Sequence, residues 1–195
     1  MPDQNTRNLM TSTKKHNIDF DFISTFEGGS LNKGYVPDAA KSKSGVTIAV
    51  GFDLGARNVN DLHALNLDNA LVDLLTPYLG LQGQSALRYV EQHPLTITDA
   101  DATAINVSVK SVLIDSLVAK YDADAGVSFA SIPAKWQTVI ASVEFQYGSV
   151  QKKCPSFWRC VIKQNWRKAI AELRDFGDRY KTRRNKEADY VEQHA

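Results

Sequence analysis

The chain has 195 residues, of which 43% are hydrophobic and 23% are charged, with 11 glycines and 6 prolines. This is the composition of an ordinary globular protein, and it excludes disordered, collagen-like and small disulfide-stapled chains. The net charge of +1 hides an asymmetry, because residues 151–195 hold 12 of the 23 Lys and Arg but only 6 of the 22 Asp and Glu. This basic quarter could face an anionic polymer, either nucleic acid or cell wall, or could be a solvated helix face.

Metal binding and membrane insertion are not expected. The four histidines form no His-x-x-x-His pair, and two cysteines are too few for a zinc cage, so we expect no metal and no other cofactor. No run approaches 18 uninterrupted apolar residues, and the first residues lack the layout of a secretion signal. We therefore expect a protein that is made in the cytosol.

The N-terminal third is predicted to contain a small β-lobe. Residues 1–16 are polar without periodicity and are expected to form a flexible arm. From Asn17 a short helix is predicted that ends where Glu27 meets two glycines. Residues 28–55 then contain six glycines and the β-branched run 46–52, which predict a strand and a β-lobe over about residues 28–57.

Nearly all of the chain after Asn58 is predicted to be helical. Apolar spacing, caps and glycine or proline stops predict seven helical segments: 59–76, 86–92, 98–120, 133–148, 157–164, 166–176 and 182–193. The first of them, 59–76, is predicted to be broken near residues 67–68. The helix over 98–120 is long enough to join two lobes. The predicted fold class is therefore α+β and mostly helical, with a larger helical lobe over about 98–195.

A set of polar residues in the β-lobe has the chemistry of glycoside hydrolysis. Glu27 is the candidate general acid, because the apolar Phe26 beside it favours the protonated carboxyl group. Thr47 is a rigid hydroxyl that could hold a water molecule, and either Asp53 or Asp38 could polarise that water. The structural alternative is that Glu27 pairs with an arginine and Asp53 caps a turn.

Several stretches resemble the phage-type lysozymes, and in particular the branch of pesticin-like bacterial toxins. The most specific are Glu-Gly after a helix at residue 27 and Thr-Ile-x-x-Gly from residue 47. The resemblance continues in Phe-Gln-Tyr-Gly at 145–148 and in the double arginine at 183–184. It implies a lysozyme-like two-lobed fold, with residues 17–195 as one catalytic domain.

The resemblance also implies an activity and a site. It implies a muramidase that cleaves the β-1,4 bond between N-acetylmuramic acid and N-acetylglucosamine of peptidoglycan, with inversion, in a cleft between the lobes. Glu27, Thr47 and Asp53 are the implied catalytic residues. Asp53 is favoured over Asp38 because the toxin branch carries its aspartate after the strand, and Phe52 stands where phage enzymes commonly have a histidine.

The resemblance assigns three further residues to the helical lobe. Arg184 is the implied buried ion-pair partner of Glu27, and Gln146 and Tyr147 are implied to contact sugar amides and rings. The tryptophans are expected in the core rather than at the sugar.

The implied partners are glycan strands of peptidoglycan and a cognate immunity protein, with no nucleic acid and no membrane insertion. A monomer is expected, made in the bacterial cytoplasm and acting in the periplasm or cell wall after export, injection or lysis, as an antibacterial effector or an endolysin.

Three other functions compete with this one. A non-catalytic peptidoglycan- or partner-binding module would be indicated by loss of the acid, but Glu27 is present. A nucleic-acid binder is disfavoured, because acidic residues interleave with the basic ones in the C-terminal quarter. A thiol peptidase would need a positioned histidine beside a cysteine. Cys154 and Cys160 could form a disulfide or remain thiols.

Overall fold

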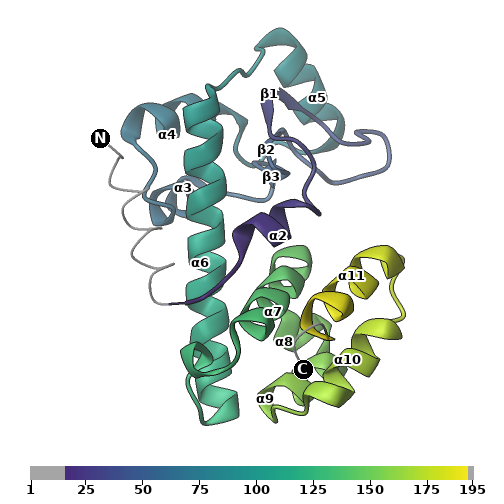
Figure 1. The fold of residues 1–195 in the computed structure, drawn as a ribbon. Coiled ribbons are helices and arrows are strands. Elements are labelled where there is room, and N and C mark those ends of the chain that lie inside the picture. Colours follow the sequence, from purple (N-terminus) through teal and green to yellow (C-terminus); the bar gives the residue numbers. More distant parts are fainter. Residues whose placement is uncertain (1–15, 193–195) are drawn as a thin grey trace. The chain divides into compact units, whose positions relative to one another are not determined.

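The computed structural model describes residues 16–192, which fall into two compact units (Figure 1). Unit 1 comprises residues 27–111, and unit 2 comprises residues 16–26 together with residues 112–192. Helices make up 61% of the structure, and unit 1 holds a small antiparallel sheet. The predicted class, α+β and mostly helical, is confirmed. Of the expected N-terminal arm, residues 1–15 lie outside the described part, whereas His16 is buried against the Phe129 ring.

The sheet of unit 1 has the order β1 (Leu31–Tyr35), β2 (Thr47–Ala49) and β3 (Phe52–Asp53). The prediction of one strand over 46–52 is wrong, because this run is a hairpin in which β2 and β3 pair. Ala49 and Gly51 have φ angles of 52° and 73°, and this left-handed backbone turns the chain back on itself.

The helices of unit 1 follow the sequence pattern closely. They are α3 (Val59–Ala64), α4 (Asn69–Leu75), the short 3-10 turn η1 (Thr76–Tyr78), α5 (Gly83–Gln92) and the first half of α6 (Asp99–Ala125). The predicted break is confirmed, since Asn66 has a φ of 51° and the Asp68 side chain caps α4 by accepting from the Leu71 amide at 2.8 Å.

Unit 1 has its own apolar core between the sheet and these helices. Its fully buried members include Val46, Ile48, Leu54, Leu62, Leu75, Ala86 and Ile105. Strand residues of the predicted β-lobe share this core with α3, α4, α5 and α6.

Helix α6 contributes to both cores. It begins with the predicted cap, since the hydroxyl of Thr98 and the carboxylate of Asp101 exchange hydrogen bonds with each other's backbone amides. Ile105 is buried in unit 1, and Leu117 and Tyr121 are buried in unit 2. By length and composition alone α6 could cross a membrane, but a core helix passes the same test, and α6 supplies residues to two cores.

Unit 2 is helical throughout its regular elements. They are α2 (Phe20–Ser24), the second half of α6, the 3-10 turn η2 (Phe129–Ser131), α7 (Ala134–Tyr147), α8 (Val150–Lys153), α9 (Pro155–Ile162), α10 (Trp166–Arg174) and α11 (Lys181–Glu192). The predicted stop of α7 is confirmed, with Gly148 as a left-handed cap at φ 70°. The four-residue α8 was not predicted.

Aromatic and sulfur-containing side chains fill much of the unit 2 core. Trp136 and Trp158 are buried, and Trp136 stacks on Trp166 with ring centroids 4.7 Å apart, as expected of core tryptophans. Cys154 and Cys160 are both free thiols. The disulfide alternative is therefore not realised in this structure.

Helix α2 ends earlier than the sequence predicts. The predicted end was Glu27, but the last helical residue is Ser24. The Ser24 and Thr25 hydroxyls donate to the carbonyls of Asp21 and Phe22, both at 2.7 Å, and such local hydrogen bonds compete with helix continuation. Glu27 consequently lies in the connection between α2 and β1.

Candidate active site

Glu27 is held by a cation from α6. Its Oε2 accepts a hydrogen bond from the Lys110 Nζ at 2.7 Å, and the two side chains are 19% and 20% exposed. Glu27 is followed by Gly28 and Gly29, where an added Cβ would meet nothing within 4 Å. The carboxylate is thus fixed on one side, and the chain beside it leaves open space.

Thr47 and Asp53 are brought together by the hairpin. They lie directly opposite each other on β2 and β3, so their side chains share one face of the sheet. Tyr35 of β1 is in turn the partner of Thr47, and the three residues form a row across the sheet. Thr47, in the middle of the row, is 3% exposed, whereas Tyr35 at one end is 40% exposed.

Both members of this pair also hold the backbone of Gly45. The Thr47 hydroxyl donates to the Gly45 carbonyl at 3.2 Å, and the Asp53 Oδ1 accepts from the amides of Gly45 and Gly55 at 2.9 and 2.8 Å. The two glycines pass so closely that a Cβ on Gly45 would lie 2.3 Å from the Gly55 Cα. The structural alternative considered for Asp53, capping a turn, is therefore real, and it occupies one carboxylate oxygen.

Asp38 has a different setting. It is exposed, has a φ of 43°, and its carbonyl accepts from the amides of Lys41 and Ser42, which makes it a turn residue in the connection between β1 and β2. It is not among the residues paired across the sheet in the described structure.

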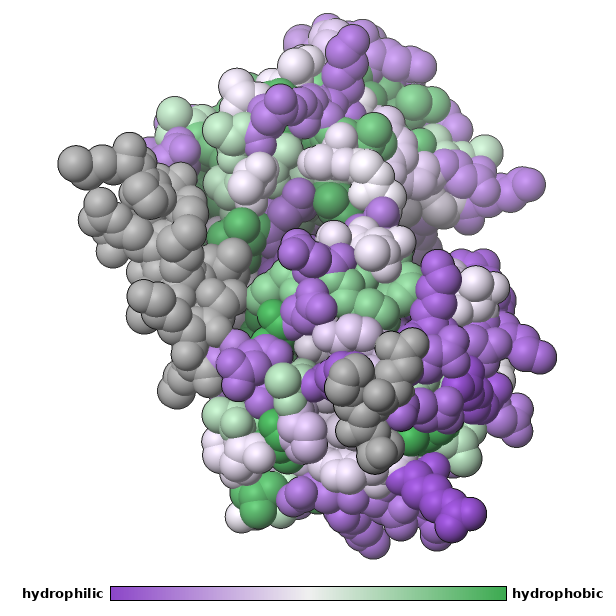
Figure 2. Space-filling model, viewed as in Figure 1, coloured by the Kyte–Doolittle hydropathy of each residue, from purple (hydrophilic) through white to green (hydrophobic). Residues whose placement is uncertain are grey.

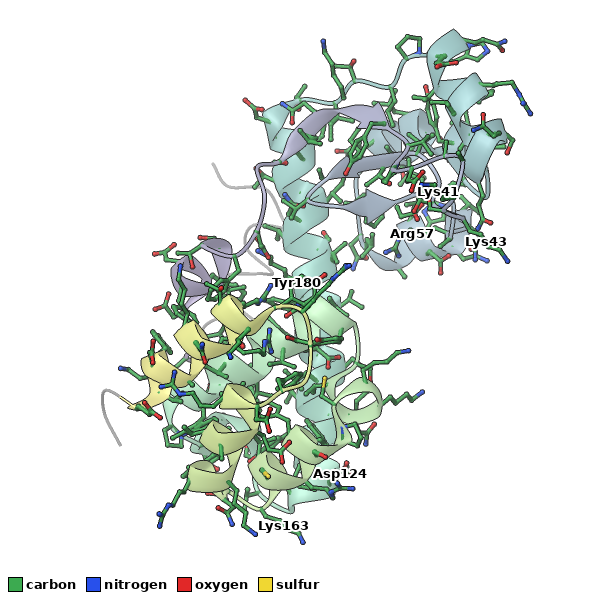
Figure 3. All side chains as sticks on the ribbon, turned by 90° about the vertical axis from the view of Figure 1, so that its right-hand side faces the viewer. Lys41, Lys43, Arg57, Asp124, Lys163 and Tyr180 are labelled. Carbon is green, nitrogen blue, oxygen red and sulfur yellow. The ribbon has the colours of Figure 1, made fainter. Side chains whose placement is uncertain are left out.

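Arg57, labelled in Figure 3, contacts both residues of β3. Its Nε donates to the Asp53 carbonyl at 3.2 Å, and its guanidinium lies 4.2 Å from the centroid of the Phe52 ring. Burial lowers the pKa of Arg57, while the nearby carboxylates of Asp61 and Asp53 raise it. Phe52, which stands where phage enzymes commonly have a histidine, is thus covered by the Arg57 guanidinium.

Unit 2 contains a pocket of about 460 Å³ rich in cations. It is lined by Phe26, Gln146, Arg179, Tyr180, Thr182, Arg183 and Lys186. Among these described lining residues three are cations and none is a carboxylate, a combination that favours an anionic ligand. Tyr180 precedes α11 (Figure 3), and hydrophilic side chains gather over α10 and α11 in the space-filling view (Figure 2).

The side chain of Gln146 is held from behind by Arg184. The Arg184 guanidinium donates to the Gln146 side-chain oxygen and also pairs with Glu187, with Nη1 and Oε2 2.9 Å apart. Arg184 and Glu187 are 1% and 0% exposed; burial lowers the pKa of Arg184 and raises that of Glu187. Tyr147 donates its hydroxyl to Asp178, and burial raises its pKa.

These contacts show where the residues expected to act in the helical lobe lie. Gln146 lines the pocket of unit 2, and its role in substrate binding stays a prediction. The expected pairing of Arg184 with Glu27 would join residues of different units and stays a prediction; within unit 2 Arg184 pairs with Glu187 and Asp178, and within unit 1 Glu27 pairs with Lys110. Glu27 and Arg184 therefore each have an ion-pair partner in their own unit. Because Arg184 is only 1% exposed, its guanidinium can orient the Gln146 side chain but has little surface for contact with a ligand.

The family described as pesticin, a bacterial toxin homologue of phage lysozyme, C-terminal part, matches residues 17–167. The chain belongs to the pesticin family. Among curated proteins none matches it. At the level of the pesticin family the chain is a lysozyme-like glycosidase related to bacterial toxins. Glu27, Thr47, Asp53 and Gln146 lie within the matched residues, whereas Arg184 lies beyond them.

Sequence reasoning missed Lys110 and the cations of the pocket. Lys110 is the one Lys or Arg between Ala102 and Ala119 in α6. A lone cation in a largely apolar stretch was the feature of the sequence that could have pointed to it. Arg179 and Lys186 were visible only as part of the basic quarter, because their convergence depends on how α11 follows α10.

Proposed function

We propose that the protein is an N-acetylmuramidase that cleaves the β-1,4 bond between N-acetylmuramic acid and N-acetylglucosamine with inversion. The observation that carries the proposal is the pairing of a hydroxyl and a carboxylate, Thr47 and Asp53, on one face of the hairpin. An inverting glycosidase needs a carboxylate to activate the attacking water, in addition to an acid for the leaving group, and a hydroxyl opposite that carboxylate gives the water a second hydrogen-bond partner.

Asp53 and Thr47 each keep hydrogen-bond acceptor capacity that a water molecule can use. The Thr47 hydroxyl uses its proton on Gly45 and keeps its lone pairs as acceptors. The Asp53 Oδ1 accepts two amides, and within the described part of the chain no hydrogen bond is given to its Oδ2. A water molecule that donates to both acceptors keeps a lone pair for attack on the anomeric carbon, and Asp53 takes its proton as the bond forms.

Glu27 is the proposed general acid. It donates a proton to the glycosidic oxygen, so that the leaving sugar departs as an alcohol. Lys110 fixes one carboxylate oxygen, Oε2, which leaves Oε1 as the oxygen that carries the proton to the substrate.

The pocket of unit 2 is the proposed contact for anionic and amide groups of the wall polymer. Gln146 presents an amide side chain to it, and Arg179, Arg183 and Lys186 supply positive charge. Carboxylates are abundant on the peptide stems of peptidoglycan, and charged donors bind them with short hydrogen bonds. Phe26, the residue before Glu27, also lines this pocket.

The biological setting follows as part of the same proposal. The toxin relationship supports an antibacterial protein that is made in a bacterial cytoplasm, reaches the cell wall of a rival by injection or export, and is neutralised in the producer by an immunity protein. We propose that it acts as a monomer and without a cofactor.

The test is lysis of purified sacculi by the wild type and by Glu27→Gln. The amide keeps the shape of the side chain but has no proton to donate, so the rate should fall by roughly 10²-fold or more while the melting temperature is retained. Glu172→Gln, on α10 of unit 2, is the matched control and should lyse sacculi at the wild-type rate. A wild type that binds sacculi without lysing them would instead establish a non-catalytic binding module.

A further inference from the structure

Side chains on one face of α6 contact both Glu27 and the hairpin that carries Thr47 and Asp53. Asn106 and Lys110 are four residues apart on this helix, so their side chains lie on the same face about one turn apart. Lys110 donates to the Glu27 carboxylate at 2.7 Å. The Asn106 side-chain oxygen accepts from the Val50 amide at 3.1 Å.

Val50 lies at the tip of the hairpin that carries the other two groups. It sits between Ala49 and Gly51, both in left-handed conformation, and the strand pair on either side begins at Ile48 and Phe52. Thr47 and Asp53 are the next pair along. A hydrogen bond to Val50 therefore fixes the turn three residues from both Thr47 and Asp53, with one strand pair between.

The two contacts are partly shielded from water. The side chains of Lys110 and Glu27 are each about one-fifth exposed, and the half-buried Val50 follows the buried residues Ile48 and Ala49. Hydrogen bonds to a charged group are shorter and stronger than neutral ones. Because α6 is a rigid helix, hydrogen bonds from it to the Glu27 carboxylate and to the turn at Val50 set the distance between these two groups.

We propose that Asn106 and Lys110 are positioning residues, which hold the acid Glu27 in register with the water-holding pair Thr47 and Asp53. This inference rests on the proposed muramidase function. Lys110 does so through the ammonium that fixes Oε2 of Glu27, and Asn106 does so through the amide of Val50. Displacement of a catalytic group by about 1 Å can lower a rate by roughly 10²-fold.

The experiment compares kcat and KM of Lys110→Met, Lys110→Arg and Asn106→Ala on soluble, uncrosslinked glycan strands. Lys110→Met and Asn106→Ala should each lower kcat about 10- to 100-fold with KM within about twofold of the wild type. Lys110→Arg keeps a cation that can reach Glu27, and it should recover kcat to within about fivefold. Melting temperatures are recorded for every variant.

Lys120→Met is the matched control. Lys120 is another α6 lysine paired with a carboxylate, 3.7 Å from Glu144 in unit 2, where no catalytic role is proposed. It should change the melting temperature without a selective loss of kcat. A purely structural role for Lys110 would give the same pattern in Lys110→Met and would overturn the inference.

The outcomes separate this inference from the function on which it rests. If Glu27→Gln is inactive but Lys110→Met and Asn106→Ala match the wild-type kcat, the muramidase assignment stands and the positioning role is wrong. If the wild type itself releases no product, the function fails and the positioning role fails with it.

Discussion

Asp53 illustrates how one residue can combine a structural and a chemical role. Its Oδ1 accepts two backbone amides, from Gly45 and Gly55. Simple removal of the side chain would confuse loss of the fold with loss of chemistry. Asparagine keeps an Oδ1 acceptor and removes only the negative charge, so Asp53→Asn isolates the charge.

We predict that Asp53→Asn lowers lysis of sacculi by roughly 10²-fold or more and leaves the melting temperature within a few degrees of the wild type. Turbidity of a sacculus suspension and thermal unfolding followed by circular dichroism measure the two effects. Asp38→Asn is the control, because asparagine tolerates the φ of 43° found there. An active Asp53→Asn together with an inactive Asp38→Asn would move the second carboxylate to the connection before the hairpin.

The site residues differ in how far the sequence could locate them. For Thr47 and Asp53, the motif resemblance singled out the two residues, but their position opposite each other depends on a hairpin that the sequence did not indicate. The partner of Glu27 was not predictable either, because several cations were available along the chain and their pairing is set by tertiary packing. Arg184 could be recognised as a buried cation, but its matching acid is Glu187, three residues away on the same helix.

At the scale of elements, the backbone before the hairpin, at Gly45, packs directly against the backbone after it, at Gly55. An added Cβ on Gly45 would lie 2.3 Å from the Gly55 Cα and 2.5 Å from the Leu81 carbonyl oxygen, and neither backbone can yield easily. The amide of Gly45 is also one of the two that Asp53 binds. Loss of this close approach should therefore disturb both stability and the site.

We predict that Gly45→Ala lowers the free energy of unfolding by at least about 2 kcal/mol, because overpacking against backbone cannot be relieved by a rotamer change. Gly28→Ala is the matched change, since an added Cβ there meets nothing within 4 Å, and it should stay within about 1 kcal/mol of the wild type. Urea unfolding of both variants gives the comparison. Equal stability of the two would mean that the close approach relaxes at little cost.

Elements with strong local signals were predicted well. The predicted break near residues 67–68, where the structure adds a cap by Asp68, and the predicted α7 stop at Gly148 follow from local backbone preferences and side-chain capping. The elements that failed lacked such signals. The run 46–52 gave no sign of its turn, because Ala49 adopts a positive φ that alanine rarely takes, and α8 is too short for a hydrophobic period to show.

At the scale of the whole molecule, charge is distributed unevenly along the chain. Twelve of the 23 Lys and Arg fall in residues 151–195, and three of them line the pocket of unit 2. The candidate acid and the hairpin pair belong to unit 1. The molecule thus has a unit with the proposed chemistry and a unit with a cationic pocket, which suits a polymer that carries both sugar bonds and carboxylates.

The bond that is cut is the most direct test of the central claim, that this pesticin-family chain is a muramidase. Sacculi digested by the wild type are reduced with borohydride, and the fragments are analysed by mass spectrometry. The account predicts muropeptides with intact peptide stems and reduced muramic acid at the new ends. Reduced glucosamine at those ends, or release of free stem peptides, would contradict it.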